Sequence, residues 1–143
     1  MSDLDKSATT LVVRSTCKLT YEGILMMLNK ICEGTAYDYV YLPWHKLAVV
    51  NFTSPEACQA AQRTLTRLST MDTSGVRYVK QAVVQGLAEN LAIFLAKSGY
   101  DAIFDPGAPR VFVLGTSFPL SSAVNVYTSL LWTSSESKTI VVL

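Results

Sequence analysis

A link of only three residues between two strand-like segments limits how this chain can fold more than any other feature. Residues 37–43 have tyrosines at three alternate positions, with Val40 and Leu42 on the opposite face, and end at a proline. Leu47–Phe52 follows directly after the link. A parallel connection needs a crossover of roughly a dozen residues or more, so these strands can pair only as an antiparallel hairpin. This pairing excludes a doubly wound parallel sheet.

Capping signals place the hairpin between two helices. Ile24, Leu28 and Ile31 recur at helical spacing, behind Thr20 as the expected N-cap. A second helix is expected to begin at Ser54, with a proline in its first position. We expect strands at residues 9–14, 37–43, 47–52 and 76–82, and helices at residues 20–32, 54–68 and 87–98.

This order predicts an α+β protein, a ferredoxin-like βαββαβ sandwich with an extra C-terminal helix and an apolar tail. In such a sandwich two helices cover one face of the sheet and the other face is open. Residues 109–115 add a strand-like segment, a short helix follows Ser121 or Ser122, and residues 139–143 could form another strand. We divide the chain into a flexible N-terminus (1–8), a domain (9–98) and a C-terminal extension (99–143) that packs on the domain or on a partner.

Composition narrows the classes of function. Half of the residues are hydrophobic and the formal net charge is +1, whereas a free-standing nucleic-acid binder usually carries a basic surplus. The first residues lack a secretory h-region, and no apolar run approaches the roughly 18 residues that cross a bilayer. We therefore expect an intracellular protein without a membrane span, located in an organelle only if a targeting peptide has been removed.

Residues that could take part in catalysis or metal binding are few and scattered along the sequence. Cys17, Cys32 and Cys58 have no CxxC spacing, so we expect reduced thiols rather than a zinc site completed by His45. A second metal interpretation, at the two aspartates of residues 101–105, lacks a third oxygen ligand, so we expect a solvated loop there. No nucleophile, base and orienting group occur together. We expect no enzyme activity, no cofactor, no metal and no small-molecule substrate.

Five stretches, in order, resemble the RNA recognition motif (RRM), and more narrowly the C-terminal RRM of the Mei-two-like RNA-binding proteins. The matching stretches are TTLVVR at 9–14, YDYVYLP at 37–43, VVNFTSPEA at 49–57, AVVQG at 82–86 and PRVFVLG at 109–115. The resemblance implies the RRM fold, a location in the nucleus or cytoplasm, and single-stranded RNA as a ligand.

The resemblance also implies where bases would stack. RRMs hold bases on exposed aromatic residues of the two central strands. Here those positions carry Val12, Leu47 and Val49. Phe52 is the one position of the two family motifs that is aromatic here as in the family, and we expect it to point into the core. An aliphatic side chain cannot supply the roughly 1–3 kcal/mol that stacking contributes per base. The loop between residues 43 and 47 is also shorter than in the family and lacks basic residues that grip RNA.

Two hypotheses remain for the open face. The first is a degenerate RRM that acts as a scaffold or accessory subunit in a larger protein assembly, with its sheet face buried by the C-terminal segment or by another protein. The second is a single-stranded RNA binder that uses a row of tyrosines and scattered basic residues, Lys46, Arg77 and Arg110 among them. Both predict contacts by the same set on one face: Val12, Arg14, Tyr37, Tyr39, Tyr41, Leu47, Val49, Asn51 and Lys80.

Overall fold

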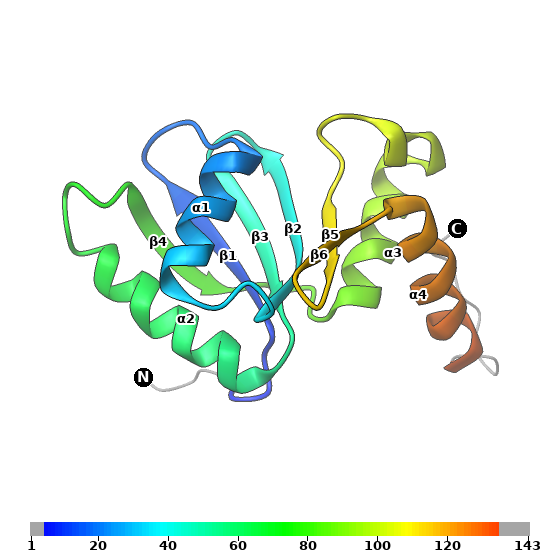
Figure 1. The fold of residues 1–143 in the computed structure, drawn as a ribbon, viewed down its shortest axis with the longest axis horizontal. Helices are drawn as coiled ribbons and strands as arrows, with labels where there is room; N and C mark the ends of the chain where they lie inside the picture. Colours follow the sequence, from blue (N-terminus) through cyan, green and yellow to red (C-terminus); the bar gives the residue numbers. More distant parts are fainter. Residues whose placement is uncertain (1–4, 135–143) are drawn as a thin grey trace.

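The computed structural model describes residues 5–134, with side chains as far as residue 127. The predicted tail strand at residues 139–143 therefore lies outside the described residues. The elements are β1 (Thr10–Ser15), α1 (Tyr21–Ile31), β2 (Tyr37–Trp44), β3 (Leu47–Phe52), α2 (Pro55–Leu68), β4 (Val76–Gln81), α3 (Leu87–Ser98), η1 (Tyr100–Phe104), β5 (Arg110–Val113), β6 (Thr116–Phe118) and α4 (Leu120–Ser134) (Figure 1).

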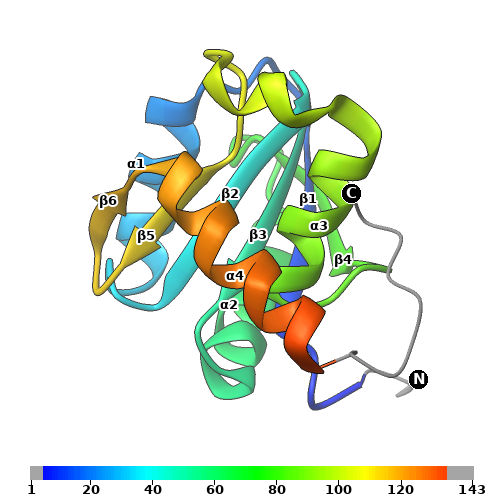
Figure 2. The ribbon, with the colours of Figure 1, turned by 90° about the vertical axis from the view of Figure 1, so that its right-hand side faces the viewer.

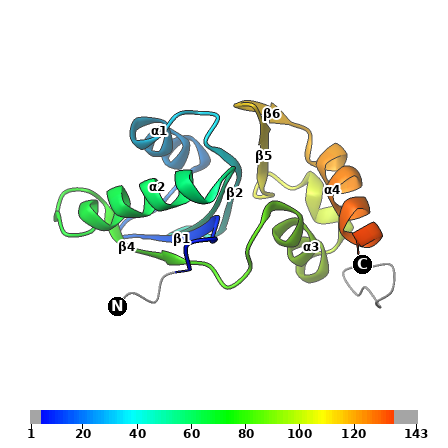
Figure 3. The same cartoon turned by 90° about the horizontal axis from the view of Figure 1, so that it is seen from below.

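One antiparallel sheet joins six strands in the order β4-β1-β3-β2-β5-β6. The predicted α+β class and the β2–β3 hairpin are confirmed. Helices α1 and α2 lie together on one side of the strands, and α3 and α4 form a second group beside β5 (Figure 3). Viewed from that second group, α3 and α4 lie in front of β2 and β3 (Figure 2). Helices therefore lie on both sides of the sheet, and α3 and α4 cover part of the second side.

The helix starts follow from local chemistry. The Thr20 hydroxyl accepts a hydrogen bond from the Gly23 amide at 3.0 Å, and the Ser54 hydroxyl accepts one from the Ala57 amide at 3.1 Å. Both predicted N-caps are confirmed. Each cap satisfies an amide that the first turn of the helix would otherwise leave unpaired.

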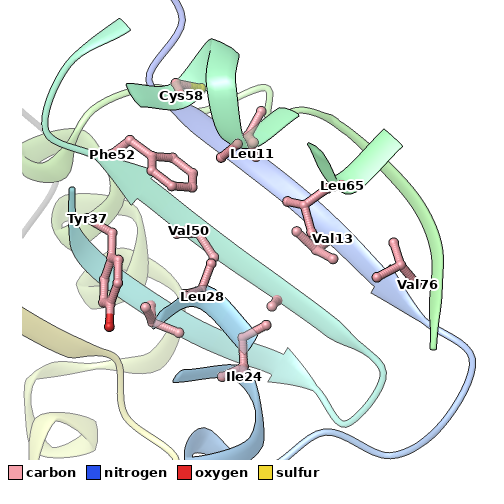
Figure 4. Packing of buried hydrophobic residues seen from close by; sticks show 13 residues of the cluster. Leu11, Val13, Ile24, Leu28, Tyr37, Val50, Phe52, Cys58, Leu65 and Val76 are labelled. Atoms are coloured by element: carbon pink, nitrogen blue, oxygen red, sulfur yellow. The ribbon is translucent and has the colours of Figure 1, made fainter. Parts of the chain in front are cut away.

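The main core lies between the sheet and the pair α1 and α2 (Figure 4). Ile24 and Leu28 of α1, and Leu65 of α2, are fully buried against β1 and β3. Cys58 belongs to this core, and burial raises the pKa of its thiol to about 11. All three cysteines carry free thiols.

Strand β2 contains two bulges that exchange its aromatic residues between faces. Tyr37 pairs with Phe52 whereas Tyr39 pairs with Asn51, so β2 has one extra residue at position 38. This bulge turns Tyr37 into the main core (Figure 4). There its ring meets that of Phe112 edge-on. The prediction that Tyr37 shares a face with Tyr39 and Tyr41 is wrong, because strict alternation fails at a bulge.

The second bulge has the opposite effect at the other end of β2. Tyr41 pairs with Val49 and Trp44 pairs with Leu47, so β2 again contains one residue more than β3. The strand continues through Pro43, where the sequence predicted its end, and the Trp44 ring lies beside Arg14 of β1. The sheet face opposite α1 and α2 thus has Trp44 in place of Tyr37.

The β5–β6 hairpin turns on a leucine with a strained backbone. Leu114 has a φ of 51° and Gly115 a φ of 83°, which is the pattern of a two-residue primed turn. Such turns favour Asn-Gly, whereas a bulky residue at positive φ is an outlier. Leu114 is 86% exposed, so no packing in the described part of the chain offsets this strain.

We expect Leu114→Asn to raise the free energy of unfolding by about 0.5–1 kcal/mol, because asparagine tolerates the left-handed conformation. Urea denaturation measures the change. Leu114→Ala is the matched control, since it removes the same side chain but keeps the strain. Equal stability of the two variants would contradict the strain argument.

Candidate functional site

The sheet face opposite α1 and α2 collects most of the residues that the sequence predicted. Val12 lies between Val49 of β3 and Lys80 of β4, and Arg14 pairs with Leu47. Directly opposed residues of neighbouring strands point to the same face. The structure therefore brings these five predicted residues together, and we call their surface the second face of the sheet.

The two remaining tyrosines of the predicted row are not free for a ligand. Tyr39 is 1% exposed and packs with Leu91 of α3 and Ala123 of α4, and burial raises the pKa of its hydroxyl. Tyr41 is half-buried, with its ring edge-on to Phe94 of α3 at 5.3 Å. The prediction of an exposed tyrosine platform is wrong for Tyr39, because α3 and α4 cover this part of the face.

Helix α3 is held over the second face by the linker that precedes it. The Gln85 side chain accepts hydrogen bonds from the amides of Thr9 and Thr10 and donates one to the Thr10 carbonyl at 2.9 Å. Gly86, the N-cap residue of α3, has a φ of 98° and a ψ of 155°, a conformation that is nearly exclusive to glycine. Its amide donates to the Thr10 hydroxyl at 2.9 Å.

The buried Asn51 side chain links neighbouring strands by hydrogen bonds. It is 4% exposed, and its Oδ1 accepts hydrogen bonds from the hydroxyls of Thr9 and Thr10 at 2.8 and 2.7 Å. Its Nδ2 donates to the Asp38 carboxylate at 2.8 Å and to the Phe52 carbonyl. Burial raises the pKa of Asp38, and the bond from Asn51 opposes that shift. Within the described residues, the hydrogen bonds of the Asn51 side chain are internal, so the structure gives it a role inside the fold, and its predicted contact with RNA or a partner stays a prediction.

An apolar groove of about 360 Å³ lies between the second face and α3. Val12 and Val49 form part of its wall on the sheet side. On the other side are Ile93, which is 39% exposed, and Val83 of the linker, which is fully exposed. The sequence analysis missed Ile93. The signal that could have found it is an apolar residue outside the α3 positions that face the core, such as Leu91 and Phe94.

The end of the second face away from the linker combines aromatic rings with cations. The Arg14 guanidinium lies 4.6 Å from the centre of the Trp44 ring, and the Lys80 amine lies 5.1 Å from that of Tyr78. The Nε atom of Arg14 is buried and has no hydrogen-bond partner within the described residues. The His45 ring lies beside that of Trp44 at the tip of the hairpin, with the ring centres 4.9 Å apart and the planes tilted by 57°.

Other chemistry-bearing residues do not converge. Among the described residues, no three His, Cys, Asp or Glu side chains form a cluster that could hold a metal ion. Arg110 lies away from the second face, with its guanidinium 4.2 Å from the centre of the Tyr21 ring on α1. None of the helices in the described part has both the length and the apolar character needed to span a membrane.

A scan against protein-family models and a search among curated proteins found no match to this chain.

Proposed function

We propose that the chain is a degenerate RRM, built on a ferredoxin-like βαββαβ sandwich, that acts as a non-catalytic protein-interaction module. The order of β1 to β4 with α1 and α2 supports the fold, because these strands stand in the sheet as β4-β1-β3-β2. The five RRM-like stretches support the family. In this proposal β5, β6 and α4 are an extension that packs on the domain.

One observation carries the proposed function. The three positions where an RRM would stack bases, Val12, Leu47 and Val49, are aliphatic and half-buried, and two of them line the apolar groove beside α3. Aliphatic walls favour contact with an apolar protein segment and contribute little to base stacking. We propose that the partner is a protein of a larger intracellular assembly, with an apolar segment in this groove.

Replacing Ile93 by glutamate tests this proposal. Ile93 is exposed enough to accept a charge without unfolding α3, and a charge in the groove should repel an apolar segment. In quantitative co-purification of the tagged full chain from its native cells, we expect at least one partner to fall about tenfold or more. The matched control is Ala96→Glu, at an exposed α3 position outside the groove lining. Unchanged partner levels in Ile93→Glu would refute the proposal.

A second candidate function is single-stranded RNA binding. Its support is the pair of cation–ring contacts at the far end of the second face, where Trp44 and Tyr78 could stack bases while Arg14 and Lys80 contact phosphates. Titration with single-stranded RNA at about 50 and about 200 mM salt separates the two functions. Micromolar binding that Trp44→Ala weakens, and Ile93→Glu does not, would favour RNA.

A further inference from the structure

A second groove, of about 600 Å³, lies on a different part of the molecule. Its walls are α2, the end of β4 and the segment before β1, and it shares no lining residue with the groove beside α3. Arg63, Thr66 and Arg67 of α2 line it together with Asp5, Lys6 and Gln81. This volume is in the range of sites that hold ligands.

Hydrogen bonds hold the wall opposite α2 in place. The amide of Asp5 donates to Gln81 Oε1 at 3.1 Å, and Gln81 Nε2 donates back to the Asp5 carbonyl at 2.9 Å. The Gln59 side chain of α2 donates to the Lys6 carbonyl at 2.9 Å. A ligand would therefore meet a groove that is already formed, which lowers the ordering cost of binding.

The groove concentrates positive charge in a chain that is almost neutral. Lys6, Arg63 and Arg67 line it, and Asp5 is the only carboxylate among the lining residues. The Asp5 carboxylate accepts hydrogen bonds from the amide and the hydroxyl of Ser7, and these bonds lower its pKa. The side chains of Arg63 and Arg67 are both exposed. Arg63 and Arg67 stand one helical turn apart, where like charges repel each other.

We propose that this groove binds an acidic segment of a partner protein, rich in aspartate or glutamate. Arginine guanidinium groups match carboxylates in geometry and charge, so two arginines one turn apart can hold successive acidic residues. The lining has no aromatic side chain on which a nucleic-acid base could stack. Its threonine hydroxyls can form hydrogen bonds to the backbone of a peptide.

Charge reversal on α2 tests the proposal. The probe is a fluorescein-labelled decapeptide of alternating Glu and Ala, titrated by fluorescence polarisation at about 50 mM salt. We expect the full chain to bind it, and Arg63→Glu/Arg67→Glu to bind about tenfold or more weakly. The matched control is Lys18→Glu/Lys30→Glu, which changes the net charge equally at exposed positions outside the groove lining. This control should retain the affinity.

Three results would overturn the proposal. One is no binding of the acidic peptide at about 1 mM protein, and another is an equal loss of affinity in both double variants. The third is that a ten-nucleotide single-stranded RNA, and not the peptide, binds and loses affinity on reversal of the two arginines, which would make the groove a nucleic-acid surface. A parallel titration of Ile93→Glu should match the wild type, because Ile93 lies outside this groove.

Discussion

Replacing Tyr39 by alanine is expected to lower the free energy of unfolding by about 3–5 kcal/mol. Tyr39 is 1% exposed, and its ring fills the space between the sheet and the two helices α3 and α4. Removing the ring leaves a cavity bounded by Leu91, Val111 and Ala123, which are themselves buried. Since these side chains belong to three different elements, the cavity can close only if α3 and α4 shift together.

The measurement is urea denaturation monitored by circular dichroism. The dependence of the unfolding free energy on urea concentration is compared between the variants. Tyr39→Phe is the matched control, because it keeps the ring, and it should stay within about 1 kcal/mol of the wild type. An exposed stacking residue would behave differently, since its truncation changes stability by only about 0.5 kcal/mol. A loss that small in Tyr39→Ala would contradict the burial of Tyr39 under α3 and α4. It would support Tyr39 as an exposed residue on which RNA bases could stack.

The sequence predicts the elements well because their signals are local. Thr20 and Ser54 satisfy amides three residues away, and the short link before Leu47 leaves the chain only one way to pair. Strand β6 carried no such signal, because it has three residues and is mostly exposed and polar. The reach of β2 past Pro43 was missed for a related reason, since a bulge depends on the partner strand.

The candidate site depended on less local information. Alternation along β2 placed Tyr37 beside Tyr39, and no residue of β2 by itself indicates the extra residue at position 38. Trp44 joined the second face only through the other bulge. Helices α3 and α4 cover the second face because of the path that the linker takes before Gly86. Hydrogen bonds from Gln85 and Gly86 to Thr10 of β1 determine that path. These bonds join residues about seventy-five positions apart, beyond the reach of any periodicity.

The hydrogen bonds of Asn51 show why the role of a polar strand residue is hard to predict from the sequence. Its position on the expected open face predicted a contact with RNA or a partner, whereas the Asn51 side chain bonds to Thr9, Thr10 and Asp38. Through the Thr10 hydroxyl the same network reaches the amide of Gly86, where α3 begins. Asn51 therefore acts on the groove indirectly, by fixing the helix that forms one of its walls.

Changing Asn51 to aspartate is expected to destabilise the fold by about 3 kcal/mol or more at pH 7. The substitution replaces the Nδ2 donor, 2.8 Å from Asp38, with a second carboxylate oxygen. Two carboxyl groups at this distance cannot both be ionised cheaply, so the folded variant retains a proton and the pKa of the pair rises. The hydroxyls of Thr9 and Thr10 keep an acceptor, so the loss comes from the position of Nδ2, which faces Asp38 at 2.8 Å and also donates to the Phe52 carbonyl at 3.2 Å.

The pH dependence identifies this cause. A pKa that is raised in the folded state favours folding below the unfolded value of about 3.9, and this contribution is lost as pH rises through the folded value. The deficit of Asn51→Asp should therefore be small near pH 3.5 and full at pH 7, in urea denaturation at each pH. Asp38→Asn/Asn51→Asp exchanges the amide and the carboxylate, and it should recover most of the stability, because one carboxylate again faces one amide. A deficit that is equal at both pH values, or that the exchange leaves in place, would show that Asn51 stabilises the fold through its shape rather than through its bond to Asp38.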